Sequence, residues 1–300
     1  MKAAVIHETG GPEVLRLEDV EDPRPGDGEV LIRVQAAGVN PVDWKRRRGG
    51  DLEFPAILGH EVSGTVEASR TDRFSEADEV FGRAASGGYA ELATASADGV
   101  AYKPEAVSHE EASTIQVSAQ TAWQALLDVA GLRGGQTALI AGAAGGVGHF
   151  AVQFAKLAGA RVIGIGSARN RDFVLGLGAD EYVDYTEQDV SEAVSDVDVA
   201  FDIVGGGMTE SLVPTVREGG FLVVIASGPP EEAAKERGFR TALHVTDSNP
   251  DEMGQIADLI GGGDVRVEIA EVIPLADARR AHELSESGHV RGKLVLAVGG

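Results

Sequence analysis

A glycine-rich turn near the middle of the chain constrains the fold more than any other feature. A short apolar strand pattern at 137–141 leads into Gly-Ala-Ala-Gly-Gly-Val-Gly at 142–148, and an amphipathic helical pattern follows it. A second apolar strand pattern lies at 161–165, at the spacing of a βαβ unit. A helix that starts after such a turn offers backbone N–H groups and the positive end of its dipole to an anion. The turn therefore predicts a doubly wound unit that binds the diphosphate of a dinucleotide. The residues expected to surround the diphosphate are Gly142, Ala144, Gly145, Gly146, Val147 and Gly148.

The end of the second strand indicates which dinucleotide is bound. Sites that prefer NAD usually carry an acidic residue here, which hydrogen-bonds the adenosine ribose. This chain instead has Gly166 and Ser167, followed by Arg169 and Arg171. A hydroxyl group and a guanidinium favour a 2′-phosphate, which a carboxylate would repel. We expect NADPH, with Ser167 and Arg169 at its 2′-phosphate. The alternative is that the arginines only solvate the start of a surface helix.

The composition excludes several classes of protein. The 300 residues include no cysteine, which removes disulfides, thiolate nucleophiles and cysteine-ligated zinc. The balance of 26 basic and 48 acidic residues gives a net charge of −22, and such a surface repels nucleic acid. No apolar stretch has the length of a membrane span, and the first residues do not resemble a signal peptide. We expect a cytoplasmic protein, either adapted to high salt, which screens the dispersed acidic charge, or simply acidic.

The hydrophobic patterning divides the chain into two kinds of segment. Residues 1–117 form short strand patterns between Gly/Pro turns, which predicts a mainly β domain. Between 118 and 260, strand and helix patterns alternate as in a doubly wound parallel sheet, and a helix at 250–260 closes it. The strand-rich segment 261–300 is expected to return to the first domain, so that the parallel-sheet domain is an insertion. An edge strand at 241–245 would allow a homodimer, with a monomer as the alternative.

Motifs along nearly the whole chain resemble one enzyme superfamily. They are Gly-Pro-Glu-Val-Leu at 11–15, Ala-Gly-Val-Asn-Pro-Val-Asp-Trp-Lys at 37–45, Leu-Gly-His-Glu at 58–61, Gln-Thr-Ala at 120–122, the glycine turn, Leu-Gly-Ala-Asp at 177–180 and Arg-Gly-Lys at 291–293. In this order they resemble the medium-chain dehydrogenase/reductase superfamily, and more narrowly its zinc-free quinone oxidoreductase and alkenal/enone reductase branch. The resemblance implies an α/β protein in which a GroES-like catalytic domain (1–117 and 261–300) carries an inserted Rossmann domain (118–260).

His60 and Glu61 require that a metal be considered, because the same motif surrounds a zinc ligand in the related alcohol dehydrogenases. Those relatives have a cysteine where this chain has Asn40, and a second cysteine completes their site. An amide is a poor zinc ligand, and the chain contains no thiol. We therefore expect no metal and a structural, hydrogen-bonded role for His60. Asp43 is an additional oxygen donor, which keeps a metal site as the alternative.

The resemblance also implies where the substrate and the cofactor are contacted. In the resembling reductases the asparagine of the Asn-Pro-Val-Asp motif, here Asn40, borders the nicotinamide, and the motif's lysine, here Lys45, reaches the substrate carbonyl. An amide N–H and an ammonium are suitable groups for stabilising negative charge on that oxygen. The alternatives are a local turn role for Asn40 and a solvated basic run for Lys45. The remaining cofactor contacts expected are Thr121, Tyr185 and Lys293 from the resemblance, and Val204 and Gly205 from their place after the fourth strand.

These residues favour one reaction over its competitors. Reduction of an isolated ketone without a metal needs a strong acid at the carbonyl, and none is identifiable. A quinone or a conjugated C=C is easier, because the charge spreads into a hydroquinone or enolate anion that solvent protonates. We expect an enzyme that transfers a hydride from NADPH to a quinone or an α,β-unsaturated carbonyl compound. The alternatives are an NADPH-binding sensor without turnover and a metal-dependent alcohol dehydrogenase.

Overall fold

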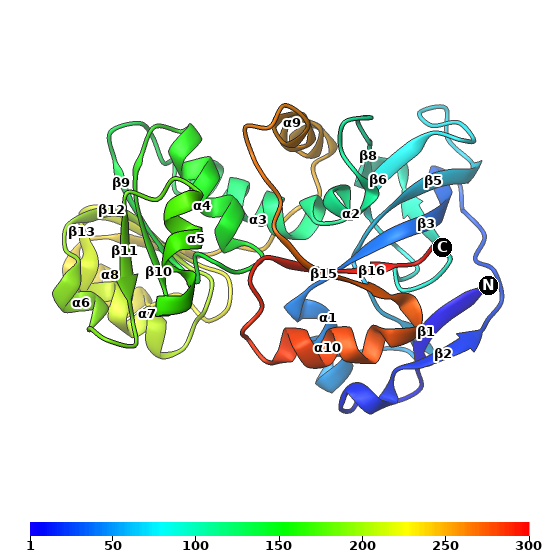
Figure 1. Cartoon of the computed structure of the whole chain (residues 1–300), viewed down its shortest axis with the longest axis horizontal. Helices are drawn as coiled ribbons and strands as arrows, with labels where there is room; N and C mark the ends of the chain where they lie inside the picture. Colours follow the sequence, from blue (N-terminus) through cyan, green and yellow to red (C-terminus); the bar gives the residue numbers. More distant parts are fainter. Residues whose placement is uncertain (300) are drawn as a thin grey trace. The chain divides into compact units, whose positions relative to one another are not determined.

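The computed structural model describes residues 1–299, which divide into two compact units (Figure 1). The first unit contains the residues up to Gln120 and those from Asp247 onward, and the second unit spans Thr121–Thr246. The second unit is thus inserted into the first, which confirms the expected insertion.

Two β-sheets form most of the first unit. A three-stranded antiparallel sheet has the order β2-β1-β4, and a seven-stranded sheet has the order β15-β16-β3-β5-β6-β8, with β7 paired to β3. β16 pairs antiparallel with β3, so the end of the chain completes a sheet built by its beginning. The strands are β1 (Lys2–Ile6), β2 (Arg16–Asp19), β3 (Glu29–Val39), β4 (Ala56–Ile57), β5 (Glu61–Ser69), β6 (Glu79–Arg83), β7 (Leu92–Ser96), β8 (Val100–Tyr102), β15 (Ile269–Pro274) and β16 (Lys293–Ala297). Alternate apolar side chains of these strands meet in one core, for example Ile32, Val62 and Leu296.

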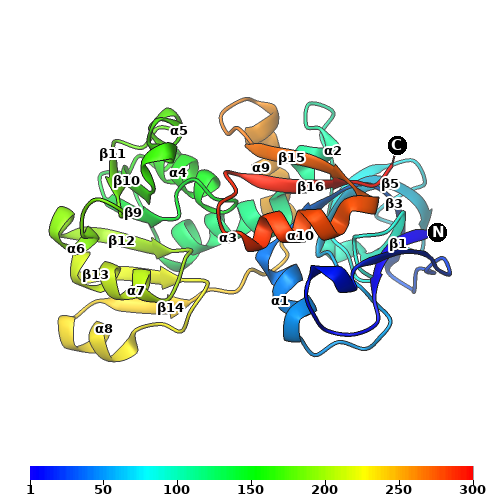
Figure 2. The same ribbon diagram turned by 60° about the horizontal axis from the view of Figure 1, so that its bottom comes forward.

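Four helices belong wholly to the first unit: α1 (Pro41–Gly49), α2 (His109–Ala112), α9 (Pro250–Gly261) and α10 (Ala278–Glu286). α1 and α10 lie side by side in both views, although they come from opposite ends of the chain (Figures 1 and 2). This neighbourhood brings residues of the Asn-Pro-Val-Asp motif next to residues more than two hundred positions later.

The second unit is built on a six-stranded parallel sheet with the order β11-β10-β9-β12-β13-β14. If β9 is counted as the first strand, this is the order of the doubly wound dinucleotide fold, which confirms the predicted fold class. The strands are β9 (Thr137–Ala141), β10 (Arg161–Gly166), β11 (Glu181–Asp184), β12 (Val197–Asp202), β13 (Val216–Val224) and β14 (Arg240–Leu243), and the helices are α3 (Gln120–Trp123), α4 (Gly148–Leu157), α5 (Arg171–Gly176), α6 (Val190–Ala193), α7 (Gly207–Leu212) and α8 (Glu231–Arg237). Figure 2 shows α7 lying along β12 and β13.

The apolar runs of the parallel strands are buried because helices cover both faces of the sheet. Leu139, Ile165 and Leu222 from three strands pack in one core, and each is fully or almost fully buried. None of the helices in residues 1–299 has the length and apolar character needed to cross a bilayer.

The structure differs from the sequence predictions in three places. α1 was not predicted, and it begins where Pro41 follows an extended Asn40 and Asp43 accepts a hydrogen bond from the Asn40 backbone. At the start of the segment 118–260, where the sequence predicts alternating helices and strands, residues 118–129 are mostly π-helical and only α3 is α-helical. α9 was assigned to the parallel-sheet domain but belongs to the first unit, where Gln120 donates to the Asn249 carbonyl that precedes it and Met253 and Ile256 are buried.

Candidate active site

The glycine turn of the second unit has the geometry of an anion site. Gly142 has a left-handed φ of +74°, and a Cβ on Gly148 would lie 2.1 Å from the Gly142 carbonyl oxygen, so neither position accepts a side chain without distortion. α4 starts at Gly148, and the N–H groups of Gly146, Val147 and Gly148 find no hydrogen-bond acceptor among residues 1–299. Three unused donors at a helix start suit the oxygens of a diphosphate, the ligand that the sequence analysis expects at this turn.

The turn after β10 is fixed by residues of β11. The Tyr182 hydroxyl donates to the Ser167 carbonyl at 2.7 Å, and the Arg171 guanidinium lies 5.2 Å from the centre of the Tyr182 ring. The Arg171 side chain thus packs on the Tyr182 ring at the start of α5, and Arg169 lies on the 3₁₀ turn before it; both side chains are exposed. Thr186 donates twice to one oxygen of Asp184, and these hydrogen bonds lower the pKa of that carboxyl. The assignment of Arg169 to a 2′-phosphate stays a prediction.

The loop after β12 is held by a buried carboxylate that sequence reasoning missed. Asp202 accepts hydrogen bonds from the N–H groups of Val204 (2.9 Å) and Gly205 (2.8 Å), and the Thr209 hydroxyl donates to its second oxygen. Val204 is 54% exposed at the carboxyl edge of the sheet. The sequence analysis located this loop but not Asp202, whose place at the end of β12, just before the loop, is the signal that would have identified it.

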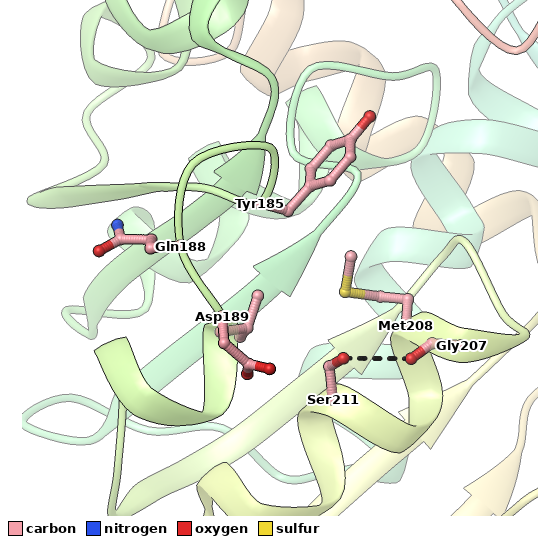
Figure 3. Close-up of a pocket in the computed structure, with 7 residues that line it drawn as sticks. Tyr185, Gln188, Asp189, Gly207, Met208 and Ser211 are labelled. Carbon is pink, nitrogen blue, oxygen red and sulfur yellow. Dashed lines mark hydrogen bonds between the residues drawn. The ribbon is translucent and has the colours of Figure 1, made fainter.

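A cavity of about 280 Å³ lies between the loop after β11 and the start of α7 (Figure 3). Its walls are Tyr185, Gln188, Asp189, Val190, Gly207, Met208 and Ser211. The Tyr185 hydroxyl has no hydrogen-bond partner among the described residues, and half of the side chain is exposed. Asp189 is occupied as the N-cap of α6, since its carboxylate accepts the Ser191 N–H at 2.7 Å. The cavity therefore lies beside one of the predicted cofactor residues, at the edge where doubly wound folds bind their ligands.

In the first unit, Asn40 is the centre of a buried polar cluster. Its Nδ2 donates to Glu61 Oε1 at 2.8 Å, and its Oδ1 accepts from Lys293 Nζ at 2.6 Å. Lys293 Nζ also contacts Glu61 Oε1 at 2.9 Å, and both Asn40 and Lys293 are only 2% exposed. Because an ammonium only donates and a carboxylate only accepts, the orientation of the amide is fixed. One of the two Nδ2 hydrogens is used, and the other has no acceptor in the described chain.

This cluster bears on the roles expected for Asn40 and Lys293. The Asn40 side chain bonds to Glu61 and Lys293, so a merely local role before Pro41 is not what the structure shows. The three Lys293 donors all lie within reach of acceptors in the first unit, the third being the Val39 carbonyl at 3.4 Å. All three donors are thus directed at acceptors within the first unit, and the expected cofactor contact of Lys293 stays a prediction.

A second buried network is joined to this cluster at Asp43. Asp43 Oδ2 accepts from the backbone N–H of Asn40 (2.9 Å) and from the Tyr89 hydroxyl (3.0 Å), and Asp43 Oδ1 lies 2.7 Å from His60 Nδ1. Burial would raise the pKa of Asp43, but the hydrogen bonds from His60 and Asn40 outweigh it and hold that pKa below its usual range. Burial, with the Asp43 charge, raises the pKa of Tyr89 well above its usual value. Tyr89 is therefore a neutral donor at physiological pH.

The network continues from Tyr89 to α10. His282 Nε2 lies 3.4 Å from the Tyr89 hydroxyl, and Arg47 Nη1 donates to His282 Nδ1 at 3.0 Å. Arg47 is fully buried and also pairs with Glu286. Burial lowers the pKa of His282 to about 4, and the Arg47 guanidinium acts in the same direction. His282 is thus neutral, with its proton on Nε2.

The donor atoms near His60 do not fit a metal ion. His60 Nδ1 faces Asp43, and Nε2 lies 3.2 Å from Arg46 Nη1. Since a guanidinium cannot accept, Nε2 is the acceptor and its lone pair is already used. Glu61 Oε1 is bonded as described, and Glu61 Oε2 accepts the Val117 N–H at 2.7 Å. Within residues 1–299, no group of three or more His, Asp or Glu is placed to hold a metal.

Two further predicted residues lie apart from these clusters. Lys45 is exposed on α1, with its ammonium 5.8 Å from the centre of the Trp44 ring, and it takes no part in the Asn40 cluster. Thr121 is buried in the second unit, where its hydroxyl is hydrogen-bonded to that of Thr246. The first and last residues of the inserted unit are thereby tied together.

Comparisons with known proteins identify the class to which this arrangement belongs. Residues 26–105 match the family model for the alcohol dehydrogenase GroES-like domain, and residues 177–296 match that for zinc-binding dehydrogenases. The quinone oxidoreductase of Mus musculus is 33% identical over 99% of this chain and 97% of its own length. The NADPH-dependent alkenal/one oxidoreductase of Arabidopsis thaliana chloroplasts is 31% identical over 99% of this chain and 79% of its own length.

Solved structures give the same result. The quinone oxidoreductase of Coxiella burnetii superposes with a TM-score of 0.95 at 35% identity, covering 100% of this chain and 99% of that one. The Escherichia coli quinone oxidoreductase complexed with NADPH has a TM-score of 0.92 at 28% identity, covering 99% and 100%. A GroES-like unit carrying an inserted doubly wound unit defines a medium-chain dehydrogenase/reductase. Within that superfamily, the chain belongs to the zinc-free quinone oxidoreductase and enone reductase branch, as its motifs predicted.

Proposed function

We propose that this protein is an NADPH-dependent, zinc-independent reductase of quinones or of the C=C bond of α,β-unsaturated carbonyl compounds. The observation that carries the proposal is the set of three unused N–H donors at residues 146–148, at the start of α4. The names of the relatives support it, since several are quinone oxidoreductases and one is an NADPH-dependent alkenal/one oxidoreductase.

The second unit would hold the coenzyme along the carboxyl edge of its sheet. The N–H groups of the glycine turn would bind the diphosphate, and Val204 and Gly205 would contact the coenzyme from the loop that Asp202 fixes. Ser167, Arg169 and Tyr185 would surround the 2′-phosphate, because they follow the carboxyl ends of β10 and β11. When bound, the reduced nicotinamide supplies the hydride.

The first unit would hold the oxygen on which charge develops. The second Nδ2 hydrogen of Asn40 is a donor whose direction is fixed by Glu61 and Lys293, so it needs no reorganisation during the reaction. A cation on α1 would add to this stabilisation, and Lys45 is the one implied by the family motif. Solvent would then supply the proton. The proposed reaction uses no Lewis acid. The donor atoms of His60 and Glu61 are not available to hold one, because they are already bonded within the protein.

A substrate screen tests the proposal. Oxidation of NADPH by the full-length protein would be followed by absorbance with 1,4-naphthoquinone, a short enone, an alkenal and a saturated ketone. Turnover with any of the first three, undiminished after dialysis against EDTA, is the expected result. Tight NADPH binding without turnover of any of them would indicate a sensor instead. Activity confined to the ketone and lost with EDTA would indicate an alcohol dehydrogenase.

Asn40→Ala provides the corresponding variant. It should lower kcat/KM by about 100-fold, which is typical for the loss of one oxyanion donor, while the Kd for NADPH stays unchanged. An equal loss in NADPH affinity and in turnover would show that Asn40 serves coenzyme binding rather than charge stabilisation.

A further inference from the structure

Four consecutive cations lie on α1, and two of them have an ion-pair partner. Arg47 and Arg48 both pair with Glu286, and Lys45 is exposed beside the Trp44 ring. Lys45, like Arg46, forms no ion pair in the described chain, but Lys45 is exposed whereas Arg46 is not. Arg46 is partly buried and forms no ion pair with any residue of the described chain, although the protein carries 48 acidic residues.

The guanidinium of Arg46 is held in place by a neutral ring. Arg46 Nη1 donates to His60 Nε2 at 3.2 Å, and His60 Nδ1 in turn donates to Asp43 Oδ1 at 2.7 Å. Asp43 is fully buried, and the His60 side chain is only 18% exposed. The relay therefore orients Arg46 without neutralising it, and four of its five N–H donors have no partner in residues 1–299.

The same carboxylate connects Arg46 to Asn40. Asp43 Oδ1 orients the ring that holds Arg46, and Asp43 Oδ2 accepts the Asn40 backbone N–H at 2.9 Å. A partly buried, oriented cation without a counter-ion binds anionic oxygen more strongly than an exposed ammonium does, because less water competes with it. An anion at Arg46 would be bound by the residues that also position the Asn40 donor.

The geometry points to Arg46, rather than Lys45, as the cation that binds the anionic oxygen of the reduced substrate, with His60 and Asp43 as its positioning residues. This inference rests on the proposed function for its substrate class. In that reaction a hydride adds to the β-carbon of the enone and the C=C electron pair moves into the enolate. The negative charge comes to rest on the oxygen that Arg46 and Asn40 bind, and water then gives a proton to the α-carbon. For a quinone the same charge lies on the oxygen of the hydroquinone anion.

Kinetics of full-length variants test the assignment. Arg46→Gln should lower kcat/KM for an enone by about 100-fold, the usual scale for an oxyanion donor, with the Kd for NADPH unchanged. Arg46→Lys should retain more activity than Arg46→Gln, and His60→Gln should lose about tenfold because the guanidinium is less well oriented. Arg48→Gln removes the same charge from the same helix and is the matched control; it should behave as the parent protein. If Lys45→Gln lowered kcat/KM for the enone more than Arg46→Gln does, the assignment would be overturned.

A binding measurement separates this inference from the proposed reaction. The probe is 4-nitrophenolate, which carries an anionic oxygen and does not accept a hydride at the carbon that bears that oxygen. Its absorbance reports its binding to the protein in the presence of NADP⁺. Arg46→Gln should weaken that binding by about tenfold or more, and Arg48→Gln should not. Dependence on Arg46 without turnover of any quinone or enone would refute the proposed reaction alone. Phenolate binding that is equal in the parent protein and Arg46→Gln would refute the anion site.

Discussion

Protonation of His282 should make the stability of the protein depend on pH below neutrality. Its ring is buried between the Tyr89 hydroxyl and the Arg47 guanidinium, and Arg47 already occupies Nδ1. A second ring proton would break that hydrogen bond and place a cation against a buried guanidinium. Burial of the ring, together with the neighbouring Arg47 charge, lowers the pKa of His282 from 6.5 to about 4.

The sign and size of the effect follow from proton linkage. Between pH 4 and 6.5 the unfolded chain binds a proton at this histidine that the folded protein does not bind. The free energy of unfolding therefore falls as the pH is lowered through this range, by about 1.4 kcal/mol for each pH unit. Between pH 6.5 and pH 4 the free energy of unfolding falls by about 3 kcal/mol in total because of this group. Above pH 6.5 the group does not make the free energy of unfolding depend on pH.

Urea unfolding at a series of pH values measures this directly. Of the two tryptophans, Trp44 lies in the first unit and Trp123 in the second, so a Trp123→Phe background leaves a fluorescence reporter for the unit that contains His282. In that background we compare His282→Asn, whose amide oxygen can still accept the hydrogen bond from Arg47, with its parent. The dependence of the free energy of unfolding on pH should be smaller in the variant by about 1.4 kcal/mol per pH unit. Carboxyl groups that titrate in the same range are common to both proteins and cancel in the difference.

His289→Gln, which removes an exposed histidine from the loop after the same helix, is the control and should keep the parental slope. Identical slopes for His282→Asn and its parent between pH 4.5 and 6.5 would refute the view that this ring is held neutral by its surroundings.

Four other outcomes are expected. Arg169→Ala should weaken NADPH binding far more than NADH binding, measured by fluorescence titration, and equal losses would contradict its assignment to the 2′-phosphate. Gly148→Ala should weaken NADPH by more than about tenfold, or about 1.4 kcal/mol, because the added Cβ would lie 2.1 Å from a carbonyl oxygen; unchanged affinity would count against the turn. Lys293→Met should destabilise the first unit by about 3–5 kcal/mol in urea unfolding by leaving its buried carboxylate partner uncompensated, and the added substitution Glu61→Gln should recover part of that loss. If the acidic surface is adapted to high salt, molar KCl should raise the melting temperature more than it does for an ordinary acidic protein, and no rise would reject the adaptation.

The sequence predicted the second unit well because its structure depends on local patterns. Strands β9 and β10, the glycine turn and the start of α4 follow from apolar runs, glycine spacing and helical periodicity within about thirty residues. The same reasoning located Ser167 and Arg169, since the end of a strand can be recognised without knowing its neighbours. It could not tell that Arg171 stacks on Tyr182, because that contact comes from the next strand.

The first unit was predicted less completely because its polar contacts join distant parts of the chain. Lys293 meets Asn40 and Glu61 only because β16 pairs with β3, and no local pattern announces that pairing. The contacts of His282 with Arg47 and Tyr89 could not be predicted for the same reason. α1 itself had a local signal, Asn-Pro followed by Asp43 and a basic last turn, which the apolar strand patterns around it concealed.

Asp43 has consequences for how such a protein can evolve. Its two oxygens serve the beginning of α1, the phenol of Tyr89 and the imidazole of His60 at once. A mutation there would disturb local folding and the candidate chemistry in a single step, so selection for a new substrate has little room at this position. Exposed residues on the same helix, such as Val42, do not hold three other groups in place as Asp43 does. Substitutions that change substrate specificity should therefore accumulate at such positions.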